Sequence, residues 1–174
     1  MDNLIGKVEL VNDLGNLTLR RARVFDASES LALINSYASS NLMLTRDYQY
    51  FYENIRDFVV VEIAGERAEP KIVACGSLHV LSKDIAEVRA LAVHPKFQRC
   101  GLGSMVVQHF IEEAQQVQVG GVFAFTLKPE FFEKLGFKLK AREELPYEVW
   151  SECIRCPKYS QCNEVGLLFE CSGD

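Results

Sequence analysis

Hydrophobic positions along the chain follow two periods, and each period predicts a different kind of element. Apolar residues that alternate or run together between turn residues predict strands, whereas apolar residues three or four positions apart predict helices. The expected strands are residues 17–24, 58–64, 71–81, 85–93, 122–126 and 165–169. The expected helices run up to Tyr37, from 47 to 56, onward from Gly103, and from 129 to 134. This order indicates a mixed α/β chain with a strand–loop–helix–strand unit at its centre.

Residues with special backbone preferences mark the ends of these elements. Asp26 or Ser28 is expected to cap the first helix, because their side-chain oxygens can accept a hydrogen bond from its first turn. Gly136 suits a left-handed helix end. The strands at 58–64 and 71–81 are expected to pair as a hairpin across a turn at 65–70.

Composition supports one domain and argues against several classes of function. The chain has 174 residues, of which 48% are hydrophobic, enough to bury a core. We expect residues 1–16 to be an N-terminal extension and residues 17–174 to be a single domain. The net charge of -5 disfavours nucleic-acid binding, and no apolar run of about 18 residues predicts a membrane span. The N-terminus lacks the pattern of a signal peptide, so the cytoplasm is the expected compartment.

The most specific chemical signal follows the expected strand at 85–93. After a turn at His94-Pro95, the letters QRCGLG (98–103) open a helix. The first turn of a helix offers backbone N–H groups without intrahelical partners and a positive dipole end, and glycines let a pyrophosphate approach closely. A glycine-rich turn before a helix is the simpler reading of the same letters. The P-loop motif is absent, and residues 101–106 read GLGSMV, which excludes the Rossmann fingerprint.

The loop resembles the Q/R-x-x-G-x-G/A motif of the GCN5-related N-acetyltransferase (GNAT) superfamily, in its usual setting between a strand and an amphipathic helix. A wider resemblance, roughly over 18–171, is to short bacterial amino-acid N-acetyltransferases of the N-acetylglutamate synthase type. It is carried by NIRDFVVVE, ACGSLHVL, EVRALAVHP, VFAFTLKPEFFEKLGF and a late cysteine segment. The resemblance implies an α/β GNAT fold, with a mixed, mostly antiparallel sheet of six to seven strands flanked by about four helices. It also implies acetyl transfer from acetyl-CoA to the α-amino group of L-glutamate, the first step of arginine biosynthesis, without a catalytic metal.

The same resemblance implies which residues hold the cofactor. Backbone groups of the strand before the loop would bind the pantetheine arm, and these belong to Leu91, Ala92 and Val93. Backbone N–H groups of the loop would bind the pyrophosphate, and these belong to Gln98, Arg99, Cys100, Gly101, Leu102, Gly103 and Ser104.

Attack of an amine on a thioester needs a base, an oxyanion donor, and a proton or a hydrogen bond for the leaving thiolate. Glu87 matches the base of the synthase family, and its other reading is a solvated glutamate paired with Arg89 on the same strand face. A backbone N–H of Leu91 or Val93 is the expected oxyanion donor. The tyrosine that many GNAT enzymes use for the thiolate is missing from FFEKLGF. Thr126 stands where the synthase family has a serine or threonine, and it is otherwise an ordinary strand residue.

Two carboxylates on L-glutamate require at least two cationic or donor groups in the site. Our candidates are Arg89, Lys128, Lys158 and Ser160, with Arg46 as a further one. The positions of Lys158 and Ser160 match an arginine and a serine that contact substrate in longer synthases. Lysine in place of arginine loses bidentate geometry.

Cysteines near the C-terminus and the identity of the acceptor leave alternatives open. Cys153, Cys156 and Cys162 form C-x₂-C-x₅-C, which fits half of a zinc site, a disulfide or plain thiols. A second GNAT reading is acetylation of another amine, such as a different amino acid, a polyamine or a protein N-terminus. A third is a non-catalytic acyl-CoA-binding module. The expected partners are a small amino acid and, as one option, a second copy in a homodimer, but neither nucleic acid nor membrane.

Overall fold

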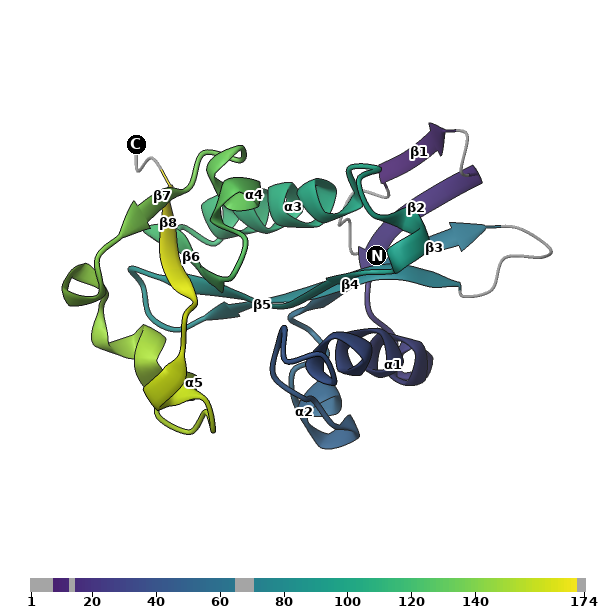
Figure 1. Ribbon diagram of the computed structural model, residues 1–174. Coiled ribbons are helices and arrows are strands. Elements are labelled where there is room, and N and C mark those ends of the chain that lie inside the picture. Colours follow the sequence, from purple (N-terminus) through teal and green to yellow (C-terminus); the bar gives the residue numbers. More distant parts are fainter. Residues whose placement is uncertain (1–7, 13–14, 65–70, 172–174) are drawn as a thin grey trace. The chain divides into compact units, whose positions relative to one another are not determined.

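The structure is a computed structural model that describes residues 8–12, 15–64 and 71–171. The turn expected at 65–70 therefore lies outside the described residues. Figure 1 labels the elements. The strands are β1 (Val8–Asn12), β2 (Gly15–Arg21), β3 (Phe58–Ala64), β4 (Ile72–Val80), β5 (Ala86–Val93), β6 (Gly121–Thr126), β7 (Lys138–Lys140) and β8 (Val165–Glu170). The α-helices are α1 (Ala27–Ala38), α2 (Tyr48–Glu53), α3 (Leu102–Gln116), α4 (Pro129–Glu133) and α5 (Trp150–Cys153).

Strand pairing confirms the α/β class and the mostly antiparallel sheet. Antiparallel ladders join β1 to β2, β2 to β3, and β3 to β4, so the expected hairpin is present. Antiparallel ladders also join β6 to β8 and β7 to β8, while β5 and β6 pair in parallel. The two strands that were not expected are β1, in the predicted extension, and β7. Strand β7 has only three residues, two of them exposed, so it lacks a readable hydrophobic alternation.

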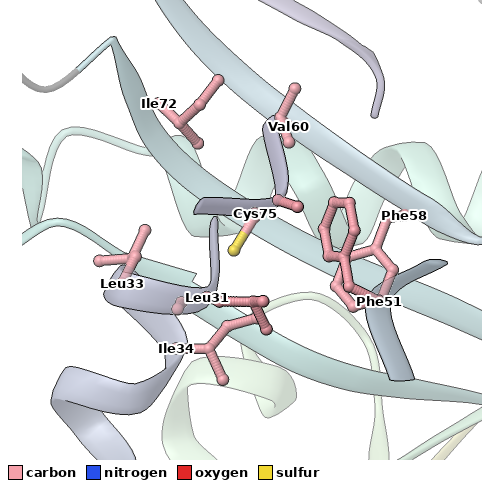
Figure 2. Packing of buried hydrophobic residues seen from close by; sticks show 10 residues of the cluster. Leu31, Leu33, Ile34, Phe51, Phe58, Val60, Ile72 and Cys75 are labelled. Atoms are coloured by element: carbon pink, nitrogen blue, oxygen red, sulfur yellow. The ribbon is translucent and has the colours of Figure 1, made fainter. Parts of the chain in front are cut away.

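The chain divides into two compact units, Met1–Ser77 with Ala90–Val106, and Leu78–Arg89 with Val107–Asp174. In the first unit, α1 and α2 pack on β3 and β4. Figure 2 shows side chains from these four elements meeting in one cluster. The ring centroids of Phe51 and Phe58, two members of this cluster, lie 4.7 Å apart. The labelled members are Leu31, Leu33, Ile34, Phe51, Phe58, Val60, Ile72 and Cys75.

The start of α1 differs from the expected cap. Asp26 occupies the N-cap position, but its carboxylate makes no capping bond to the helix, and Ser28 is exposed. Instead, Asp26 accepts from the Arg20 guanidinium at 2.6 and 2.9 Å and from the Arg23 N–H at 2.6 Å. Burial alone would raise the pKa of Asp26, but these donors hold it below its ordinary value. A buried carboxylate gains more from the charge-assisted bonds of a guanidinium than from a backbone N–H of the helix, which explains the difference.

The second unit has its own smaller core, which includes Ile85, Phe123, Leu145 and Val149. Parallel pairing sets Glu87 of β5 opposite Phe123 of β6. Gly136 follows α4 with φ of 91°, which confirms the expected left-handed end. Among the helices described in either unit, none is both long and apolar enough to cross a bilayer.

Candidate active site

The glycine loop of the first unit has an unusual backbone. A 3₁₀ turn at Pro95–Phe97 precedes it, and both Arg99 (φ 62°) and Gly101 (φ 84°) are left-handed. A Cβ at Gly101 would meet nothing within 4 Å, so the space in front of this backbone is open. Residues 98–101 are exposed, whereas Leu102 is buried and anchors the loop to the fold. Turns with left-handed residues can present successive backbone N–H groups to an anion, so this loop is a candidate for binding one.

Helix α3 begins within this loop, at Leu102. Its first turn closes with a hydrogen bond from Met105 N–H to the Gly101 carbonyl at 2.9 Å. The N–H groups of Leu102, Gly103 and Ser104 come before that bond, so no carbonyl of the helix lies one turn back for them. The N–H of Gln98 differs, because it donates to Pro95 within the 3₁₀ turn at 3.4 Å. Among residues 98–104, which are expected to bind the pyrophosphate, the N–H groups of Leu102, Gly103 and Ser104 are therefore more available than that of Gln98.

The end of β5 leads into this loop. Ala92 is buried in the first unit's core, whereas Leu91 and Val93 are half-buried, as expected for residues on the other face of the strand. Ala90 is left-handed with φ of 53°, which interrupts the regular strand just before Leu91.

Glu87 and Arg89 form a buried ion pair in the second unit. Glu87 is 5% exposed, so it is not a solvated glutamate, although its expected partner is correct. Arg89 reaches the same carboxylate oxygen twice, from Nε at 2.8 Å and from Nη2 at 2.6 Å. Arg89 Nη1 also lies 3.4 Å from Oε1 of Glu152 in α5. A carboxylate and an arginine seldom enter a protein interior without a structural or chemical role.

Glu152 has no recognisable signal in the sequence. It is one acidic residue in the tail, 63 positions after Arg89, and neither spacing nor periodicity connects the two. Only the packing of α5 beside the start of β5 within the second unit brings the carboxylate to the guanidinium. Local sequence reasoning therefore finds Glu87 and Arg89 but misses the third charged group.

The cysteine segment follows Glu152 directly. Burial raises the pKa of the Cys153 thiol to about 12, and the negative charge of Glu87 adds to the rise. Cys156 Sγ accepts from the Lys158 N–H at 3.4 Å, and Cys162 Sγ lies 3.8 Å from a Glu164 carboxylate oxygen. All six cysteines fall in the described ranges and are free of disulfides. Within those ranges, no group of three or more histidine, cysteine or acidic residues is arranged to hold a metal ion.

The remaining expected site residues have varied surroundings. Thr126 Oγ1 accepts from the Lys128 N–H at 2.9 Å, and the Lys128 side chain is exposed at the end of β6. Lys158 is half-buried and Ser160 is exposed in the cysteine segment. These four residues belong to the same unit as Glu87. Arg46 belongs to the first unit, where its guanidinium lies 4.1 Å from the centre of the Tyr50 ring.

A match to known proteins agrees with this geometry. A family model described as "Acetyltransferase (GNAT) family" matches residues 27–137, more than half of the chain. The chain belongs to the acetyltransferase (GNAT) family. It is accordingly an N-acetyltransferase that uses acetyl-CoA, and the motif at 98–103 lies inside the matched region.

Individual relatives of this acetyltransferase are named more finely. An uncharacterized N-acetyltransferase of Chlorobaculum tepidum is 31% identical over 86% of this chain and 94% of its own. An amino-acid acetyltransferase of Mycobacterium tuberculosis is 33% identical over 79% and 77%, respectively. A crystal structure of N-acetylglutamate synthase from Neisseria gonorrhoeae with coenzyme A and N-acetyl-glutamate aligns with a TM-score of 0.78. That likeness covers 90% of this chain and 35% of the other at 23% identity, so it speaks for the fold.

Proposed function

We propose that this acetyltransferase transfers the acetyl group of acetyl-CoA to the α-amino group of a free amino acid, with L-glutamate as the acceptor. The observation that carries the proposal is the buried Glu87–Arg89 pair on β5, the strand that ends in the cofactor residues Leu91 to Val93. The relative named amino-acid acetyltransferase, at 33% identity, supports an amino-acid acceptor. The synthase named for N-acetylglutamate shares the fold and supports the choice of glutamate.

Glu87 is the proposed base. The ammonium group of the acceptor must lose a proton before its nitrogen can attack the thioester carbonyl, and a carboxylate in reach can take it. The Arg89 Nε and Nη2 contacts go to Oε2 of Glu87, so a proton on Oε1 would leave these two contacts in place. A guanidinium alone would make the carboxylate a weaker base. Glu152, on the other side of Arg89, partly offsets that positive charge.

Two further roles complete the transfer. The tetrahedral oxyanion needs a donor, and the N–H of Leu91 or Val93, beyond the left-handed Ala90, is the proposed one. The departing thiolate needs a proton or a hydrogen bond, and the Thr126 hydroxyl is proposed to donate that hydrogen bond while keeping its proton. Because Thr126 Oγ1 accepts the Lys128 N–H, its own hydroxyl proton is not used in that bond. The sequence offers no tyrosine in FFEKLGF, where Phe132 is buried against Phe137 with ring centres 5.1 Å apart.

The two carboxylates of L-glutamate would be bound by Arg89, Lys128, Lys158 and Ser160, with Arg46 as a further candidate. Arg89 already faces Glu87 and Glu152, so the lysines would supply most of the remaining positive charge. Glu87, Arg89 and Glu152 together carry a net charge of about -1. This charge favours a second candidate, an acceptor with fewer carboxylates such as another amino acid. We also propose that residues 17–174 form one domain and that residues 1–16 are an extension of it. The proposed compartment is the cytoplasm, and the proposed pathway is arginine biosynthesis.

Steady-state kinetics with L-glutamate, L-glutamine and L-lysine test the acceptor. L-glutamate should have by far the highest kcat/KM of the three. Replacing Lys158 with alanine should raise the KM for glutamate more than it lowers kcat, because a contact to an unreacting carboxylate contributes uniform binding. Lys83→Ala, at an exposed lysine of the same unit, is the matched control. Equal kcat/KM values for glutamate and lysine would overturn the glutamate assignment.

A further inference from the structure

One hydroxyl group in the first unit contacts both ends of the segment that leads into the glycine loop. Tyr37, near the end of α1, donates its Oη hydrogen to the carbonyl oxygen of Val93, the last residue of β5. The same Oη accepts from Nε2 of the Gln98 side chain at 2.6 Å. These contacts connect residues 56 and 61 positions apart in the chain. Neither the motif nor the family resemblance pointed to Tyr37.

The hydrogen-bonding capacity of these groups leaves room for a ligand. A tyrosine hydroxyl has one proton, which goes to Val93, and its oxygen accepts from Gln98. A backbone carbonyl oxygen has two lone pairs, so Val93 can still accept an amide N–H from a bound molecule. The Tyr37 ring packs against the first unit's hydrophobic cluster, which fixes the direction of the hydroxyl. Tyr37 therefore connects the end of β5 to the start of the loop and leaves one lone pair of the Val93 carbonyl oxygen for a ligand.

We propose that Tyr37 is a positioning residue for acetyl-CoA, which holds the Val93 carbonyl and the start of the phosphate loop in their binding arrangement before the cofactor arrives. The inference rests on the cofactor residues of the proposed function. A loop that is already ordered loses less conformational entropy on binding, so its ligand binds more tightly. Without the hydroxyl, Gln98 loses its acceptor and the loop must be ordered by the cofactor itself.

Calorimetric titration with CoA measures the effect directly. Tyr37→Phe keeps the ring and removes the hydroxyl, and the expected result is a Kd about 3- to 10-fold higher, the range of one hydrogen bond. Gln98→Ala should give a similar rise without touching the core. The double variant should add little to either single one, because both remove the same link. Tyr52→Phe, at a partly exposed tyrosine of α2 in the same unit, should leave the Kd unchanged.

Kinetics separate positioning from a general loss of structure. In Tyr37→Phe the KM for acetyl-CoA should rise, while kcat at saturation and the acceptor KM stay within about twofold of the wild type, as for an interaction present in both ground and transition states. An unchanged Kd in both single variants, or fully additive effects in the double variant, would overturn the proposal. A lower Kd in Tyr37→Phe would also overturn it, since the hydroxyl would then compete with the cofactor. CoA binding by a wild type that acetylates no amino acid would count against the proposed acceptor alone.

Discussion

Replacing Glu87 with glutamine removes the proposed base while keeping its size and its ability to accept a hydrogen bond from Arg89. If Glu87 takes the proton from the ammonium group, kcat should fall about 10²- to 10⁴-fold at neutral pH. Binding of CoA should change little, because the proposed cofactor residues come later in β5 and in the loop. Part of the loss should return at higher pH, where more of the acceptor arrives as the free amine.

The same replacement has a cost for folding. Removing the charge of one partner in a buried ion pair costs up to about 3–5 kcal/mol when the other partner is left alone. Two features of the site reduce that cost here. The glutamine carbonyl can still accept from Arg89, and Glu152 Oε1 stays 3.4 Å from the guanidinium. We expect a loss of about 1–3 kcal/mol in the free energy of unfolding, which urea titration would measure.

The first unit offers a control with the same chemistry, although its glutamate side chain is 36% exposed, against 7% for Glu87. Arg20 Nε donates to Glu62 Oε2 at 2.7 Å, almost the distance of the Arg89–Glu87 contact. Glu62→Gln makes the same chemical change in an arginine–glutamate pair without an assigned role in catalysis. Thiol release from acetyl-CoA would be measured for both variants at saturating substrates across pH 6–9. This assay separates the loss of a catalytic base from the loss of a stabilising ion pair. Near-normal turnover of folded Glu87→Gln at pH 7, or an equal loss in Glu62→Gln, would refute Glu87 as the base.

Three other predictions concern the loop, α1 and the cysteines. Gly103→Val should raise the Kd for CoA at least about tenfold with little change in Tm, because its side chain would crowd the N–H groups proposed to bind the pyrophosphate; calorimetry would measure it. The lowered pKa of Asp26 means that its stabilisation is present above about pH 4 and is lost as the pH falls through the folded-state value. Asp26→Asn should therefore cost about 1–3 kcal/mol at pH 7 and flatten the acid limb of a stability–pH profile. With a pKa of about 12, Cys153 should be alkylated by iodoacetamide at pH 8 far more slowly than exposed Cys100, as peptide mass spectrometry would reveal.

Local patterns predicted much of the fold because they depend on neighbours in the chain. The β3–β4 hairpin, the helix after the glycine loop and the left-handed Gly136 all follow from residues a few positions apart. The Glu87–Arg89 pair belongs to the same class, since residues two apart on a strand share a face. These elements of the fold and this ion pair were therefore accessible from the sequence, whereas the role of the glycine loop in cofactor binding stays a prediction.

Contacts between distant segments were not accessible in this way. Glu152 meets Arg89, and Tyr37 meets Val93, only after the chain has folded. The predicted cap of α1 was wrong for the same reason. The Asp26 carboxylate could cap the helix or pair with a cation, and the contact with the Arg20 guanidinium selects the second role. The partner of a buried charge depends on which distant segments pack together, and a pattern of neighbouring residues does not contain that information.

A competition experiment tests the proposed activity most directly. The wild-type protein would be incubated with isotopically labelled acetyl-CoA and equal concentrations of L-glutamate, L-glutamine, L-lysine and spermidine, and the acetylated products quantified by mass spectrometry. In such a mixture, product ratios equal the ratios of kcat/KM. We predict that N-acetyl-L-glutamate, acetylated on its α-nitrogen, is the dominant product. A predominance of acetyl-lysine, acetyl-glutamine or acetylspermidine would contradict glutamate as the acceptor.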